Sequence, residues 1–91
     1  MINSEKLLNY VKEGRSLKIQ GKRKEAILTF KKALKIKNND HEIYNNIGVI
    51  YSELNNFEKA ILSYRQAVKF NPKYSIAYNN LGNALQFLGE I

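Results

Sequence analysis

The side chains in this sequence best suited to recognition chemistry are amides. Asn46 and Asn80 lie 34 residues apart, within two near-identical segments, Tyr44-Asn45-Asn46-Ile47-Gly48 and Tyr78-Asn79-Asn80-Leu81-Gly82. A side-chain amide offers two donors and an acceptor, which suits an extended peptide backbone read without regard to its side chains. The alternative is that both amides are simply solvated. This pattern favours non-covalent peptide contact.

Catalytic and metal chemistry have few candidate residues. His41 is the single histidine, cysteine is absent, and the Asp+Glu total is 8. No nucleophile stands with a base and an orienting group, and His41 has no second histidine or cysteine with which to share a metal. We therefore predict no enzyme activity, no catalytic residues, no metal site and no cofactor.

The elements that position these amides follow an internal repeat. Gly14, Gly48 and Gly82 are separated by steps of 34 residues. Further columns in the same register are Tyr10, Tyr44 and Tyr78; Ala26 and Ala60; Phe30 and Tyr64; Ala33 and Ala67. Several columns in one register indicate a repeat architecture.

Apolar residues within each repeat recur at helical spacing, as Ala26, Ile27, Phe30, Ala33 and Leu34 do. The pattern predicts an all-α chain with five helices, over 4–20, 23–37, 41–54, 57–70 and 74–88. Gly and Asn residues mark the breaks, together with the Asn71-Pro72 step. Because the connections are short, we expect consecutive helices to pack antiparallel.

A glycine inside a helix costs about 1 kcal/mol relative to alanine. We expect Gly14, Gly48 and Gly82 to mark places where another helix approaches closely. The recurring alanines would supply the matching thin surface on that helix, and aromatic residues such as Phe30 and Tyr64 would fill the space beside the contact.

The repeat resembles the tetratricopeptide repeat (TPR), a 34-residue helix–turn–helix unit. Residues 41–74 carry its pattern at Tyr44, Ile47, Gly48, Tyr51, Ala60, Tyr64, Ala67 and Pro72. The first unit departs from it at Glu13, Leu17, Arg23 and Asn38. The resemblance implies an alpha-alpha superhelix (a TPR solenoid) of two full repeats plus one additional helix. We expect a single domain over 1–91, with repeats at 7–40 and 41–74 and a partial repeat at 75–91.

The resemblance also implies a protein–protein interaction scaffold that binds a peptide or partner protein in a concave groove. In this family the first helix of each repeat lines the groove. The groove positions carried over from the family are Lys12, Arg15, Asn45, Asn46, Val49, Asn79, Asn80 and Asn83, with Glu53 and Phe87 on the same helices.

Some members of the family grip a C-terminal carboxylate with Lys, Asn and Arg side chains. The corresponding positions here are Val11, Arg15, Asn46, Ile76 and Asn80, of which only Asn46 fits. We therefore do not expect binding of chaperone tails by that mechanism. Lys12 and Arg15 remain able to attract an acidic side chain.

The charge is concentrated in the first part of the chain. Residues 1–40 carry 11 basic and four acidic side chains, whereas residues 41–91 carry four of each. The alternative function is therefore anion or nucleic-acid binding through the basic N-terminal half. We rank it second and do not expect a nucleic-acid partner, because lysines are ordinary on a solvated helix face and no aromatic residues interleave with them to stack bases.

The last predicted helix, 74–88, carries several large apolar residues, among them Tyr78, Leu81 and Leu85. We expect self-association through this helix. No run of about 18 apolar residues predicts a membrane span, and the N-terminus has no apolar stretch typical of a secretory signal. We expect a cytoplasmic location.

Overall fold

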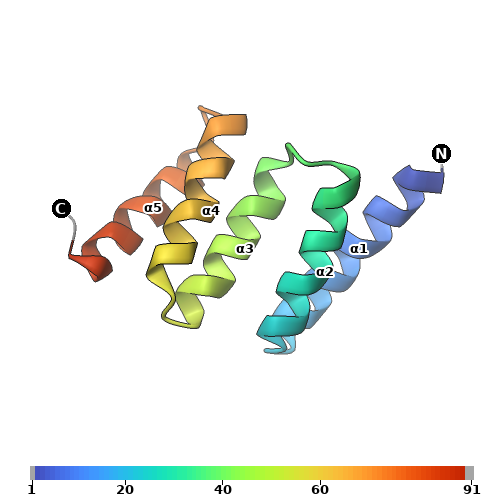
Figure 1. Ribbon diagram of the computed structural model, residues 1–91, viewed down its shortest axis with the longest axis horizontal. Helices are drawn as coiled ribbons and strands as arrows, with labels where there is room; N and C mark the ends of the chain where they lie inside the picture. The colour runs from blue at the N-terminus through green and yellow to red at the C-terminus, as the bar shows by residue number, and fades with distance from the viewer. Residues whose placement is uncertain (1, 90–91) are drawn as a thin grey trace. The chain divides into compact units, whose positions relative to one another are not determined.

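The computed structural model describes residues 2–89, which form five helices and no strand (Figure 1). The helices are α1 (Ile2–Ile19), α2 (Arg23–Ile36), α3 (His41–Glu53), α4 (Phe57–Phe70) and α5 (Ser75–Leu88). The prediction of five helices is confirmed, with each boundary within two residues of the expected one. No helix in this part of the chain combines the length and the apolar character needed to cross a bilayer.

The helix ends follow local sequence signals. The Asp40 carboxylate accepts hydrogen bonds from the backbone N–H groups of Glu42 and Ile43, and the Asn56 side chain accepts one from Lys59 N–H. These oxygens satisfy donors that the first turn of a helix leaves without an intrahelical partner. Capping therefore fixes where α3 and α4 begin.

Three helices end next to a residue in the left-handed conformation. Gly21, Asn55 and Gly89 have φ angles of 79°, 61° and 80° and stand 34 residues apart. Glycine and asparagine tolerate this conformation better than other residues, so they stop a helix without steric penalty. The repeat register thus extends to the backbone of the turns.

The chain has two compact units, Met1–Asn39 and Asp40–Ile91. In the first unit α1 packs against α2, and the α2 residues Ala26, Ile27, Phe30 and Ala33 are buried. In the second unit α4 packs against both α3 and α5 (Figure 1). Its core cluster contains Ala60, Ile61, Tyr64 and Ala84.

The helical glycines of α1 and α3 lie against aromatic rings. A Cβ atom built on Gly14 would lie 2.7 Å from Phe30 Cε1, and one on Gly48 would lie 2.5 Å from Tyr64 Cε1. Both distances are far below van der Waals contact, so only glycine fits. The prediction of close approach is confirmed at these two positions. The contact is made by an aromatic ring of the following helix and not by an alanine.

At Gly82 the same prediction is wrong. Nothing in the described part of the chain lies within 4 Å of a Cβ atom built there, and Gly82 is exposed. The sequence pattern repeats at Gly82, but no aromatic ring in the described part of the chain covers this glycine.

A departure from the repeat in α1 also has a local cause. Glu13 stands where the second unit has Ile47, and the buried Thr29 hydroxyl donates a hydrogen bond of 3.2 Å to Glu13 Oε1. A polar pair therefore replaces an apolar contact between α1 and α2, so the buried hydroxyl is satisfied.

We predict that Gly48→Ala lowers the free energy of unfolding by about 1–3 kcal/mol, because the buried Tyr64 ring cannot retreat from the new methyl group. Gly82→Ala is the matched control, in which the better helix propensity of alanine acts in open space and adds up to about 1 kcal/mol. Urea denaturation followed by circular dichroism measures both. Equal shifts in the two variants would contradict the packing argument.

Candidate functional site

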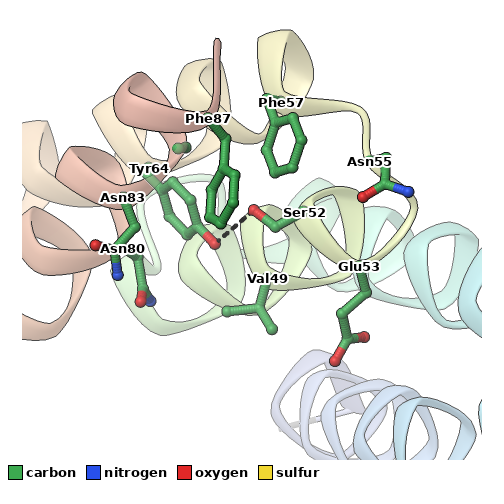
Figure 2. A pocket seen from close by; sticks show the side chains of 10 residues that line it. Val49, Ser52, Glu53, Asn55, Phe57, Tyr64, Asn80, Asn83 and Phe87 are labelled. Atoms are coloured by element: carbon green, nitrogen blue, oxygen red, sulfur yellow. Dashed lines mark hydrogen bonds between the residues drawn. The ribbon is translucent and has the colours of Figure 1, made fainter. Parts of the chain in front are cut away.

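A hollow of the second unit lies between α3, the start of α4 and α5 (Figure 2). Its volume is about 460 Å³, within the range of about 300–1,000 Å³ typical of ligand sites. The residues that line it are Val49, Ser52, Glu53, Asn55, Phe57, Tyr64, Asn80, Asn83, Ala84 and Phe87.

One wall of the hollow is aromatic. Phe57 at the start of α4 stacks on Phe87 near the end of α5, with ring centroids 5.1 Å apart and planes inclined by 11°. Phe87 nevertheless remains 73% exposed, so this apolar ring is available to a ligand. Figure 2 shows the two rings side by side.

Tyr64 lines the hollow and is almost fully buried, at 2% exposure. Its hydroxyl lies 3.2 Å from Ser52 Oγ, and this hydrogen bond joins α4 to α3 (Figure 2). Burial raises the pKa of the Tyr64 phenol above 10.0; the hydrogen bond with Ser52 acts in the opposite direction, and the charge of Glu53 adds to the rise. Tyr64 is therefore neutral at physiological pH.

The amides predicted to line a groove have unequal surroundings. Asn80 Nδ2 donates a hydrogen bond of 3.1 Å to Asn45 Oδ1, and Asn45 is only 6% exposed. This bond holds the Asn80 side chain against α3 at the edge of the hollow. Asn80 keeps its own carbonyl oxygen and a second N–H for a ligand. Neither Asn45 nor Asn80 is thus a merely solvated amide.

The hollow is lined by five of the residues that the sequence analysis assigned to the groove: Val49, Glu53, Asn80, Asn83 and Phe87. Asn46 is partly buried outside the lining, and Asn79 is exposed on α5. Lys12 and Arg15 are exposed on α1, in the first unit.

The sequence analysis missed five lining residues, which lie outside the groove positions or in second helices: Ser52, Asn55, Phe57, Tyr64 and Ala84. An assignment restricted to selected positions of first helices excludes them. The sequence feature that could have pointed to them is the short Asn55-Asn56 turn, because it brings the start of α4 beside the end of α3.

A smaller, basic hollow of about 350 Å³ lies in the first unit, between α1 and α2. It is lined by Asn3, Lys6, Tyr10, Lys32, Lys35 and Ile36. Lys32 Nζ lies 5.9 Å from the centroid of the Tyr10 ring. Helix packing thus places Tyr10 beside a lysine that is far from it in sequence.

His41 has structural contacts at the start of α3. Its ring packs edge-on against Tyr74, with centroids 4.6 Å apart, and its Nε2 lies 3.2 Å from Asn71 Nδ2. Within residues 2–89 no group of three or more His, Cys, Asp or Glu side chains is arranged to hold a metal ion.

The comparisons with known proteins agree with the repeat. A family model described as TPR repeat matches residues 14–55 and 50–89. Among curated protein sequences there is no match. The first TPR of Spaghetti (RPAP3) bound to HSP90 peptide SRMEEVD is similar, with a TM-score of 0.89 and 29% identity, over 93% of this chain and 68% of that one.

Two further solved structures share the fold. The second TPR of Spaghetti (RPAP3), bound to the same HSP90 peptide, has a TM-score of 0.90 and 22% identity, covering 98% of this chain and 84% of that one. The second TPR domain of the human RPAP3 protein, in complex with HSP70 peptide SGPTIEEVD, has a TM-score of 0.91 and 22% identity, over 97% and 73% of the two chains.

We predict that Tyr64→Phe lowers the free energy of unfolding by about 0.5–1.5 kcal/mol near neutral pH, through loss of the bond with Ser52. Phe30 fills the equivalent position in the first unit, so the ring itself is accommodated. Urea denaturation at neutral pH measures the change, and a variant as stable as the wild type would contradict it.

The same variant has a pH signature. Because the folded chain holds the Tyr64 proton more tightly than the unfolded chain, its stabilisation is fully present below about pH 10 and is lost as the pH rises through the raised pKa. The wild type should therefore lose more stability than Tyr64→Phe between about pH 9 and about pH 11. Equal losses would show that Tyr64 does not contribute to the pH dependence.

Proposed function

Because this chain belongs to the TPR repeat family, we propose that it is a non-enzymatic interaction module that binds a peptide or partner protein. The binding surface is the face of the first helices, centred in the second unit on the hollow between α3 and α5. The observation that carries the proposal is the pairing of an exposed aromatic wall with the tethered amide of Asn80. Similar TPR domains of RPAP3 are bound to peptides.

The proposed groove residues remain those assigned from the sequence, with different roles. Asn80 and Asn83 bond the peptide backbone, Val49 contacts its side chains, and Asn45 positions Asn80. Asn46 and Asn79 extend the polar surface along α3 and α5. In the first unit, Lys12 and Arg15 are exposed on α1 and would contact a partner there.

The proposal extends to the organisation of the whole chain. We take 1–91 as one TPR domain, with repeats at 7–40 and 41–74 and a partial repeat at 75–91. In support, α1 meets α2 and α3 meets α4 through the same glycine–aromatic contact. A cytoplasmic location stays a prediction, in keeping with a chain that has no cysteine.

The test uses peptides selected on the full chain from a random display library. We expect the double variant Val49→Ala with Asn83→Ala to weaken the selected peptides about tenfold, because both side chains face the hollow. Leu62→Ala, an exposed apolar residue of α4 outside this hollow, is the control and should bind as the wild type does. Isothermal titration calorimetry measures the affinities.

Asn80→Ala is a less selective probe than Asn83→Ala. It removes the partner of the buried Asn45 amide, which costs about 1–3 kcal/mol of stability in addition to any loss of binding. Unchanged affinity in the Val49 and Asn83 double variant would contradict the proposed site. Acidic peptides that bind only at low salt would instead favour the alternative, an anion site around Lys32 and Tyr10.

We also propose self-association through α5. Ile76 and Tyr78 are 54% and 47% exposed although both are large and apolar, and pairing of two copies would remove them from water. Sedimentation velocity should detect a dimer that the double variant Ile76→Glu with Tyr78→Glu abolishes. A wild-type chain that sediments as a monomer at high concentration would contradict this.

A further inference from the structure

One face of α5 carries a glycine prepared for a ring that the chain itself does not supply. In the earlier helix pairs an aromatic ring of the following helix lies on a helical glycine, as Tyr64 does on Gly48. Gly82 occupies the same repeat column on α5 and is exposed. A Cβ atom built on Gly82 would meet nothing of the described chain outside its own helix within 4 Å. The place for a ring is therefore open.

An exposed ring lies beside this glycine on the same face. Tyr78 precedes Gly82 by four residues, and side chains at that spacing are neighbours on a helix surface. Tyr78 is 47% exposed, whereas the tyrosine of the same column in α3, Tyr44, stacks on Phe70 of α4 with ring centroids 5.7 Å apart. The helix α5 thus exposes both halves of the glycine–ring contact next to each other.

A face with a ring beside an open glycine is complementary to itself. When two copies of α5 pack antiparallel about a two-fold axis between these residues, Tyr78 of each copy lies on Gly82 of the other. A two-fold interface has this reciprocity, in which residue i meets residue j and residue j meets residue i. One pairing event makes the glycine–ring contact twice. The partly exposed Leu85, three residues after Gly82, adds apolar area on the same face.

The charges of the chain favour a second copy along this helix. A net charge of +7 makes two copies repel each other in general. Of the five helices described, α5 is the one without an Asp, Glu, Lys or Arg residue. Copies that meet along α5 therefore bring no like charges into direct contact.

We propose that two copies of this chain pair through α5, with the Tyr78 ring of each copy seated on Gly82 of the other. The inference rests on the self-association proposed above and names the contact that produces it. Neither Tyr78 nor Gly82 lines the hollow of the second unit. Pairing and peptide binding thus use different faces of α5, and the dimer offers two hollows to a bivalent partner.

The variant Gly82→Ala separates pairing from folding. A Cβ atom on Gly48 would lie 2.5 Å from the Tyr64 ring, so a methyl group on Gly82 should likewise exclude the ring of the other copy. In the single chain, however, alanine favours the helix. We expect the variant to unfold at a higher urea concentration than the wild type when both are monomeric. Its dimer should nevertheless be weaker by about tenfold or more in sedimentation equilibrium.

Two further variants complete the series. Tyr78→Ala removes the ring and should weaken the dimer by a similar factor. Asn83→Ala is the matched control, because Asn83 is exposed on α5 directly after Gly82 but lies on the side of the hollow. It should form the dimer as the wild type does.

The outcomes distinguish this inference from the proposal on which it rests. A Gly82→Ala dimer as tight as that of the wild type would overturn the glycine–ring contact. If Ile76→Glu with Tyr78→Glu still abolished the dimer, self-association through α5 would stand without that contact. A wild-type chain that stays monomeric at high concentration would overturn both.

A mixture of isotope-labelled and unlabelled copies of the full chain tests the contact itself. Isotope-filtered nuclear Overhauser spectra report contacts between copies and remove those within one helix. We expect cross-peaks between the Tyr78 ring protons of one copy and the Gly82 α-protons of the other. Contacts between copies that join other residues and leave Gly82 out would overturn the inference.

Discussion

The contact between a helical glycine and the aromatic ring of the next helix is the constraint on which the rest of the structure depends. Phe30 lies on Gly14 and Tyr64 lies on Gly48, each within a distance that excludes any Cβ atom. Both rings are buried, so the contact fixes the separation and the facing surfaces of each helix pair. In the second unit the Tyr64 hydroxyl shares a hydrogen bond with the Ser52 hydroxyl, and Tyr64 lines the hollow. Fold and candidate site thus share one side chain.

Much of the fold could be predicted because its signals are local or periodic. The 34-residue step, the apolar helix faces and the Asp and Asn residues before helices give the five helices nearly to the residue. The environment of a repeated residue is not repeated, however. Gly82 carries the sequence signal of Gly14 and Gly48 without the ring that gives those residues their role.

The site was harder to predict for a geometric reason. Asn80 bonds to Asn45, which is 35 residues away, so the pair falls outside the register that a repeat alignment compares. Phe57 reaches the hollow from the turn into α4, and no inspection of selected positions in the first helices would include it. Val49, Asn80 and Asn83 could be named from the sequence because the resemblance to the TPR repeat carries the groove positions over to the first helix of each repeat.

The two units differ in what they offer a partner. The first unit carries the excess of lysine, with Lys32 beside Tyr10, whereas α3 and α5 offer amides, rings and carboxylates. A repeat that served only as a frame would not need the two units to expose different kinds of side chain. It is the expected result if the repeat supplies the frame and individual side chains on that frame supply selectivity.

The most direct measurement is of nuclear Overhauser effects between a bound, isotopically filtered peptide and the labelled methyl groups and aromatic rings of the full chain. The account predicts contacts from the peptide to the methyl groups of Val49 and the ring of Phe87. Contacts confined to Leu62 on α4, or to Leu8 and Leu28 in the first unit, would place binding elsewhere and contradict it.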